Sequence, residues 1–178
     1  MSNAPKEWRG RFYEDLDVGD VYRSRLGRTV TEADNVWFTC LTMNTNQVHF
    51  NDAFAARTRF GRPLVNGCFT LALVTGLSVP DLSENATAHL GWTDVRLPAP
   101  VLAGDTIWAE SEILALRRSR SSPDAGLVSV RTRGLNQRGE VVIEFLRTFM
   151  LPRRAARVPD AFPEPASGWT VGSEQAPA

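Results

Sequence analysis

One histidine follows a run of uncharged polar residues, in a loop that could carry out proton transfer. The run is Asn44-Thr45-Asn46-Gln47, and Val48 and His49 come next. An imidazole gains and loses protons near neutral pH, and amide side chains can orient water without carrying charge. Residues of this kind also hydrogen-bond their own backbone in turns. The loop alone therefore fits an ordinary polar turn between two helices better than a catalytic site.

Composition excludes several other kinds of chemistry. The chain has 178 residues, which fits one domain, and 43% of them are apolar, enough for a buried core. The 20 acidic and 20 basic residues cancel, so no nucleic-acid or anionic-membrane surface is indicated. Lys6 is the only lysine. Schiff-base chemistry and a Walker-type phosphate loop both need a well-placed lysine, so both are close to excluded.

The two cysteines and the apolar runs bear on location. Cys40 and Cys68 lie in apolar segments rather than at metal-ligand spacing, which argues against a disulfide framework or a zinc site. No apolar run is long enough to span a bilayer, and the first residues lack the apolar core of a signal peptide. We expect a cytoplasmic protein without a metal or a membrane partner.

The first half of the chain predicts one strand followed by three helices. The strand covers 21–30, and Thr31 to Asp34 then has the pattern of a capping box that opens a helix. Asn51 or Asp52 can cap a short helix over 53–57. The third helix lies within 64–77, capped by Asn66, and is apolar on nearly every face. A helix of that kind must be buried, so a sheet has to wrap it.

The second half supplies that sheet. Turn residues separate four β-rich segments, at 87–96, 106–116, 127–133 and 140–151. Their hairpin spacing indicates an antiparallel sheet, which gives an α+β protein with a curved sheet around one helix. A single sheet leaves its edges uncovered, so we expect a homodimer or an assembly of dimers. The domain should cover 12–154, between a mobile N-terminus at 1–11 and a Pro/Gly/Ala-rich tail at 155–178.

Four short motifs, in order along the chain, resemble one protein family. Met43–His49 (MNTNQVH) is similar to G-D-x-N-P-[LIV]-H, and Phe60–Gly67 (FGRPLVNG) to F-x-R-P-I-V-H-G. Thr75-Gly76 matches a hydroxyl-Gly pair, and Pro100–Thr106 (PVLAGDT) resembles P-V-x-x-G-D-T. The family is that of the MaoC-type dehydratases, which includes the (R)-specific enoyl-CoA hydratases. The resemblance implies a hot-dog fold, in which a curved antiparallel sheet wraps a long central helix.

The resemblance also implies roles for three residues. His49 falls on the catalytic histidine, and Thr75 on a helix serine that supports the catalytic pair. Gly67 falls on the glycine whose backbone N–H holds the thioester oxygen. Physical chemistry agrees with this last role, because N–H groups in the first turn of a helix are unpaired and the helix dipole is positive there. The missing side chain also lets a thioester approach the backbone.

One departure from the family pattern concerns the catalytic aspartate, which maps to Asn44. An amide cannot take a proton from water, Asn46 keeps the asparagine of the motif, and Gln47 replaces its proline. Three alternatives stay open. His49 is the only general base while Asn44 holds the water, or a group of the substrate assists, or the site is inactive toward ordinary enoyl-CoA.

The resemblance therefore predicts an acyl-CoA hydratase or dehydratase whose only cofactor is the coenzyme A of its substrate. A branched dicarboxylic thioester such as itaconyl-CoA or mesaconyl-CoA is the substrate to test first, because Asn44 and Asn46 could bind a second carboxylate. Arg62 and Asn66 are further candidates for binding substrate. A hot-dog thioesterase is an alternative, although Gly67–Leu77 contains no acidic residue. A silent acyl-CoA-binding subunit that lost its aspartate is another.

Simpler structural roles compete with these assignments. Asn66 could only cap its helix, and Thr75 could only satisfy a backbone carbonyl. His89 begins a strand and fits a surface or edge position better than a ligand role. The run Arg117-Arg118-Ser119-Arg120 could hold the phosphates of coenzyme A, but a solvated hairpin end is the preferred interpretation. Arg62, beside Pro63, could contact a phosphate or an interface.

Overall fold

The fold is known from a computed structural model, which describes residues 9–156 together with 163 and 166. Six strands form one antiparallel sheet in the order β1-β4-β5-β6-β3, and β2 pairs with β4 beside β1. The strands are β1 (Val21–Arg23), β2 (Arg28–Thr29), β3 (Ala88–Arg96), β4 (Thr106–Arg118), β5 (Ala125–Asn136) and β6 (Val141–Pro152). Most of the predicted N-terminal segment and of the predicted tail lies outside the described residues.

The sheet confirms the four strands predicted for the second half and corrects the first. The single strand predicted over 21–30 is wrong, because β1 and β2 are separate. Their separation has a local cause at Ser24, whose Oγ accepts the N–H of Ala109 at 3.0 Å. A side-chain oxygen there takes the place of a strand carbonyl, so the ladder stops and resumes only where Arg28 pairs with Ile107.

The helices begin within one residue of the predicted starts, but the second ends at Ala55 rather than at residue 57. They are α1 (Glu32–Leu41), α2 (Asp52–Ala55) and α3 (Gly67–Leu77), with single turns η1 (Tyr13–Asp15), η2 (Gln47–His49) and η3 (Val79–Ser83). At the start of α1, Thr31 Oγ1 accepts the N–H of Asp34, and Asp34 accepts the N–H of Thr31 at 2.8 Å, which confirms the capping box. Asn51 caps α2 and Asn66 caps α3, each through a side-chain oxygen that accepts a backbone N–H of the first turn. Among the described residues no helix has the length and apolarity to cross a membrane.

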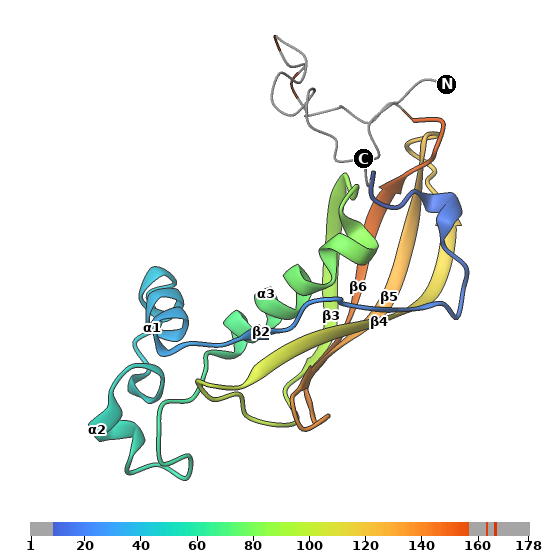
Figure 1. Ribbon diagram of the computed structural model, residues 1–178. Helices are drawn as coiled ribbons and strands as arrows, with labels where there is room; N and C mark the ends of the chain where they lie inside the picture. The colour runs from blue at the N-terminus through green and yellow to red at the C-terminus, as the bar shows by residue number, and fades with distance from the viewer. Residues whose placement is uncertain (1–8, 157–162, 164–165, 167–178) are drawn as a thin grey trace, which may run out of the picture.

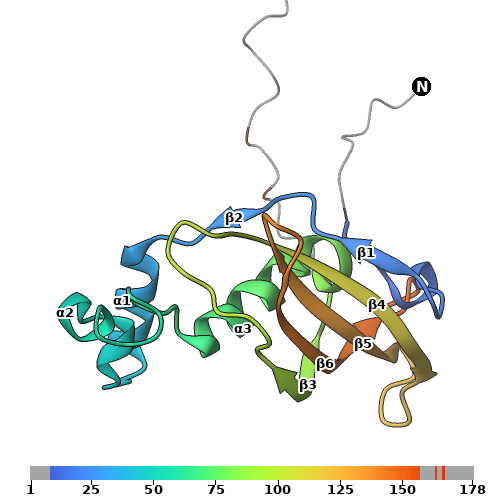
Figure 2. The same ribbon diagram turned by 90° about the horizontal axis from the view of Figure 1, so that it is seen from below.

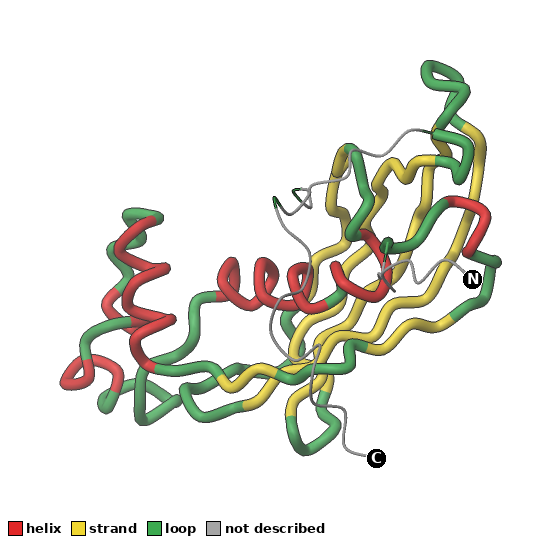
Figure 3. Tube along the Cα trace, turned by 45° about the horizontal axis from the view of Figure 1, so that its top comes forward, coloured by secondary structure: helices red, strands yellow, loops and turns green. Residues whose placement is uncertain are grey.

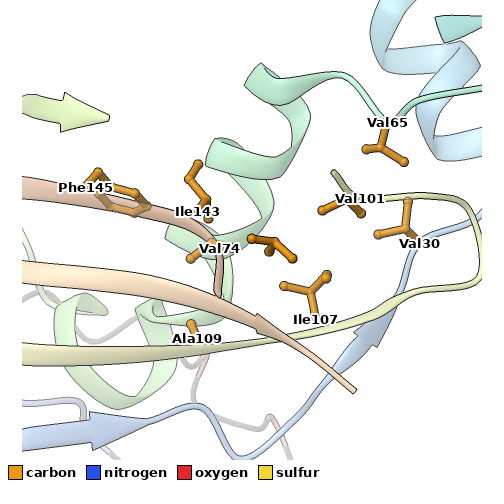
Figure 4. Close-up of a cluster of buried hydrophobic side chains, with 9 residues drawn as sticks. Val30, Val65, Val74, Val101, Ile107, Ala109, Ile143 and Phe145 are labelled. Carbon is orange, nitrogen blue, oxygen red and sulfur yellow. The ribbon is translucent and has the colours of Figure 1, made fainter. Parts of the chain in front are cut away.

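The central helix α3 lies along the inner face of the curved sheet, whereas α1 and α2 lie beyond its N-terminal end and away from the sheet (Figures 1 and 2). The tube view also shows α1 and α2 apart from the sheet and α3 against it (Figure 3). Val74 of α3 packs between Ile107 of β4 and Ile143 and Phe145 of β6 (Figure 4). A β-carbon at Gly134 would lie 2.6 Å from Val74 Cγ2, so this glycine lets α3 approach β5 closely. This is the hot-dog arrangement that the sequence predicted.

One expectation about α3 is wrong for the chain taken alone. The helix was predicted to be buried on every side, yet Cys68, Ala72 and Gly76 are exposed along one face. The reason is that one sheet covers one side of a helix only. The edge strand β3 is also uncovered, and it exposes three large apolar side chains, those of Leu90, Trp92 and Val95, with a fourth at Leu97 just after the strand.

Candidate active site

The polar run that precedes His49 forms a tight turn. Met43 has the left-handed backbone angle φ 53°, and Asn44 Oδ1 accepts the N–H of Asn46 at 3.0 Å. Asn46 Oδ1 in turn accepts the N–H of Val48 at 3.3 Å and caps η2. Both amide oxygens therefore hold the backbone that carries His49. The amide nitrogen of Asn44 is the group that this turn leaves to orient a water molecule, and its role toward substrate stays a prediction.

His49 is held in one orientation. Its side chain is buried, and Nδ1 lies 2.8 Å from the carbonyl oxygen of Leu64. Because a carbonyl can only accept, Nδ1 carries the proton in the neutral ring and Nε2 keeps its lone pair. The backbone of Leu64 donates to the carbonyl of Val48 at 3.0 Å, so the histidine turn and the segment that leads to α3 are paired. An imidazole with a lone pair on its outer nitrogen can act as a general base.

Asn35 positions the site and was missed by the sequence analysis. It is 2% exposed in α1, and its Nδ2 donates to the carbonyls of His49 at 2.7 Å and Leu64 at 3.0 Å. Its Oδ1 accepts the N–H of Asn66 at 2.8 Å. One amide thus joins α1, the histidine turn and the start of α3. Asparagine is disfavoured inside helices, and that was the available signal.

The first turn of α3 leaves one N–H without an acceptor. Asn66 Oδ1 accepts the N–H of Cys68 at 2.9 Å, and its carbonyl accepts that of Thr70 at 3.1 Å. Within the described residues no acceptor takes the N–H of Gly67. A β-carbon at Gly67 would lie 3.0 Å from Leu97 Cδ1, so a side chain here would crowd Leu97, whereas glycine leaves the space beside its N–H free. A ligand oxygen could accept from this N–H at the positive end of the helix dipole. Asn66 itself caps the helix, and its role in binding substrate stays a prediction.

A small pocket of about 120 Å³ opens beside His49. Arg62 lines it, and Arg62 Nη2 donates to the carbonyl of Ala103 at 2.9 Å. Glu32 and Asp52 place two carboxylates in the same pocket, and the sequence analysis singled out neither. Acidic residues are common in the first turns of helices, where both of these lie, so nothing in the sequence marked them.

Two predicted groups lie elsewhere. Thr75 is eight residues after Gly67, about 12 Å along the helix, and its Oγ1 is buried without a partner among the described residues. The chain alone therefore does not bring Thr75 to His49, and its supporting role stays a prediction. The arginines of Arg117-Arg118-Ser119-Arg120 are exposed where β4 ends, as a solvated hairpin end would be.

His89 occupies the edge position that was predicted for it, in β3. Its ring stacks on Trp92 with the centroids 5.4 Å apart and is tilted against Phe149 at 5.9 Å. Burial lowers the pKa of His89 because it removes water from the charged form, and the positive charge of Arg147 lowers it further. His89 is thus held toward its neutral form.

A family profile described as mesaconyl-CoA hydratase matches residues 2–170. The mesaconyl-CoA hydratase of Cereibacter sphaeroides is 36% identical over 86% of this chain and 45% of its own length. The (R)-specific enoyl-CoA hydratase of Aeromonas caviae is 31% identical over 78% of this chain and 98% of its own length.

Solved structures agree with these matches. The crystal structure of a MaoC-like dehydratase from Rhodospirillum rubrum superposes with a TM-score of 0.73 at 30% identity, covering 83% of this chain and 100% of that one. In the comparison with the mesaconyl-CoA hydratase, by contrast, the matching part of this chain spans about half the length of the relative.

Proposed function

Because the chain belongs to the mesaconyl-CoA hydratase family of MaoC-like proteins, we propose that it is an acyl-CoA hydratase or dehydratase. It adds water across the C2–C3 double bond of an enoyl-CoA thioester, or removes it. The observation that carries this proposal is the 2.8 Å contact between His49 Nδ1 and the carbonyl of Leu64. That contact leaves Nε2 as a base, and Leu64 lies three residues before the unpaired N–H of Gly67.

The chemistry follows from these groups. As a water oxygen attacks C3, His49 Nε2 takes its proton, and Asn44 donates an amide hydrogen to orient that oxygen. The electrons of the double bond move toward the thioester, whose oxygen gains negative charge and accepts from Gly67. The imidazolium then returns its proton to C2, which completes the addition of water. Elimination is the same path in reverse.

A dicarboxylic substrate of the mesaconyl-CoA type is part of the proposal. It is supported by the name of the family profile and of the Cereibacter relative, which is 36% identical. Coenzyme A would arrive with the substrate, and we propose that no other cofactor takes part. We also propose a cytoplasmic location, which the two free cysteines favour.

A homodimer completes the proposed assembly. Two features support it, the uncovered edge strand β3 with its exposed Trp92 and the open face of α3 around Ala72. The Cereibacter relative also has about twice the length that this chain matches, so two copies would supply a comparable mass of protein.

The direct test is to incubate the protein with crotonyl-, mesaconyl- and itaconyl-CoA and separate the products by chromatography, while free thiol is measured in parallel. We expect a hydrated thioester, formed fastest from a dicarboxylic substrate, and no free thiol. Release of thiol at enzymatic rates would instead establish a thioesterase.

A second candidate is a silent acyl-CoA-binding subunit. It is favoured by Asn44, which stands where the family has aspartate and whose oxygen is already bonded to Asn46. Tight binding of the three thioesters without turnover of any of them would support this candidate and overturn the first.

A further inference from the structure

A buried arginine at the other end of α3 has unused hydrogen-bond donors. Arg147 of β6 is 2% exposed, and its Nη2 donates to Ser78 Oγ at 2.8 Å. Its Nε and Nη1 are buried and have no partner among the described residues. The guanidinium carbon lies 5.0 Å from the ring centre of Phe149, so one face of the cation rests on an aromatic ring.

Among the described residues, no acidic side chain compensates the charge of Arg147. Burial lowers the pKa of Arg147 to about 10, so the guanidinium still carries its charge at neutral pH. The positive charge of Arg147 helps to lower the pKa of the neighbouring His89, and an imidazole can only be neutral or positive, so His89 provides no counter-charge. Buried cations are normally paired, because burial removes the water that stabilises their charge. A counter-ion from outside the chain is therefore expected.

The surroundings of Arg147 favour an anion with several acceptor atoms. Ser78 Oγ donates to the carbonyl of Thr75 at 2.6 Å, and Thr75 Oγ1 is itself buried without a partner. Two guanidinium nitrogens of Arg147, Nε and Nη1, and the hydroxyl of Thr75 thus remain unused among the described residues at one end of α3. A carboxylate offers two oxygens with about four acceptor positions, and guanidinium is the side chain that best matches that geometry.

We infer that Arg147, with the hydroxyl of Thr75, binds the distal carboxylate of a dicarboxylic acyl-CoA and thereby selects this substrate class, while Ser78 orients the guanidinium. The inference rests on the proposed function. A substrate with a methyl group at that position would leave the cation buried and unpaired, and a site built to pair a polar group discriminates strongly against an analogue that lacks it.

The reach of the substrate decides which subunit supplies the arginine. Ser78 follows Gly67 by 11 residues, about 16 Å along the helix, and these are opposite ends of α3 (Figure 1). A four-carbon diacid extends only about 5 Å from its thioester carbon, with bonds of about 1.5 Å. Arg147 therefore serves the site of a second copy. If two α3 helices pack antiparallel about Ala72, Gly67 of one chain lies opposite Leu77 of its partner.

The open face of α3 allows this approach. Cys68, Ala72 and Gly76 are small and exposed, and they recur every four residues along one side of the helix. On the edge strand β3, Trp92 pairs with Arg147 in register and is 43% exposed. Both features lie on the surface that the proposed dimer would cover.

The experiment compares kcat/KM for mesaconyl-CoA and crotonyl-CoA in the wild-type, Arg147→Met and Arg147→Lys proteins. We expect Arg147→Met to lower the value for mesaconyl-CoA by about a hundredfold and to leave crotonyl-CoA within about threefold. Arg147→Lys keeps the positive charge but loses the planar guanidinium that can bind both carboxylate oxygens. Its kcat/KM for mesaconyl-CoA should lie between those of the wild type and Arg147→Met. Arg131→Met is the matched control, because Arg131 pairs with Glu112 in an exposed ion pair at 3.0 Å, and it should change neither value. Equal losses for both substrates in Arg147→Met, or no loss, would overturn the inference.

A second measurement needs no variant and no turnover. Calorimetric titration of the wild-type protein with succinyl-CoA and with butyryl-CoA compares a four-carbon diacid thioester with its monoacid. We expect succinyl-CoA to bind at least about tenfold more tightly, since one charged hydrogen bond is worth about that much. Equal affinities would overturn the inference even if the proposed hydration were established. A failed hydration assay with selective binding would instead overturn the proposed function alone.

Mixed dimers test the assignment to the partner. His49→Ala and Arg147→Met subunits are combined in equal amounts by unfolding and refolding together, and activity is measured with mesaconyl-CoA. If Arg147 acts across the interface, each hybrid dimer has one intact site, so about a quarter of wild-type activity returns. If it acts within its own chain, no site is intact and activity stays at the level of the separate variants, which would overturn the assignment to the partner.

Discussion

The two ends of α3 differ in how completely their polar groups are satisfied. At the N-terminal end, Asn35 joins the carbonyls of His49 and Leu64 to the backbone of Asn66, and the residue that remains open is Gly67. At the C-terminal end, the buried guanidinium of Arg147 has two nitrogens, Nε and Nη1, without a partner among the described residues. Complete hydrogen bonding fixes a catalytic group in place, whereas incomplete hydrogen bonding marks a position that a ligand must fill.

The comparison assigns reaction and selectivity to different ends of one helix. Substitutions near the N-terminal end should affect all substrates alike, because every enoyl thioester needs the base and the N–H donor. Substitutions near Arg147 should separate substrates by their charge.

The largest effect is expected from His49→Ala. Loss of the general base should lower kcat for crotonyl- and mesaconyl-CoA alike by about a thousandfold. The fold should persist, because the carbonyl of Leu64 keeps its bond to Asn35. Product formation under saturating substrate, with circular dichroism as the folding check, measures this. His89→Gln is the control and should stay near the wild-type rate. A folded His49→Ala protein with more than a tenth of wild-type activity would show that His49 is not the general base.

Asn35→Ala should reduce both stability and activity. It removes the donor to two buried carbonyls and the acceptor of the Asn66 N–H, so we expect a loss of about 2–3 kcal/mol in unfolding free energy. Activity should fall at least about tenfold for both substrates, because His49 is no longer held. Asn136→Ala is matched in burial at 3% exposed, but Asn136 is the last residue of β5. It should cost stability without the kinetic loss, and equal kinetic losses would mean that Asn35 acts only through stability.

Asn44→Asp should raise activity toward crotonyl-CoA. The new carboxylate can still accept the N–H of Asn46 and adds a second proton acceptor near the attacking water. A gain in kcat of about tenfold is expected from initial rates, at the low end of what general base catalysis contributes. Asn46→Asp places the same charge two residues away and should give no gain. An unchanged rate in Asn44→Asp would show that this position does not limit the reaction.

The smallest effect concerns α1, which carries Asn35. Hydrogen bonds from Arg28 and from the backbone and hydroxyl of Thr31 hold the pKa of Asp34 well below its usual range. A depressed carboxyl pKa adds stability above the unfolded value, and this stability is lost as pH falls through the folded pKa. Asp34→Asn should therefore lower unfolding free energy by about 0.5–1 kcal/mol near pH 7, allowing for solvent screening.

The difference caused by Asp34→Asn should shrink as pH falls from about 5 toward 2, because protonation of the native carboxyl removes the same interactions. Urea unfolding at several pH values measures this. Glu112→Gln, which removes an exposed ion pair, is the control and should have little effect at any pH. A constant difference across this range would show that the carboxylate charge is not the source of the stability.

The local features of the fold could be predicted because their causes are local. Capping residues such as Thr31 and Asn66 placed the helix starts, and turn residues between β-rich segments placed the four long strands. The open face of α3 could not be predicted, because an apolar helix requires cover without saying which chain supplies it. Asn35 could not be assigned a role, since its partners lie up to 31 residues away.

The site at Arg147 was partly visible in the sequence. Alternation in β6 places Arg147 on the inner face with Phe145 and Phe149. The sequence alone therefore indicated a charged side chain in an otherwise apolar row. Its missing partners were not, because they depend on what the rest of the chain brings near. The sequence resemblance supplied His49 and Gly67, and the structure adds the contacts that position them.

The most direct measurement of the central claim is a crystal structure of the wild-type protein with succinyl-CoA, which has no double bond to hydrate. We expect the thioester oxygen at the N–H of Gly67 and His49 Nε2 facing C3. The distal carboxylate should lie within hydrogen-bond distance of Arg147 of the partner subunit. A thioester bound away from both His49 and Gly67 would contradict the account.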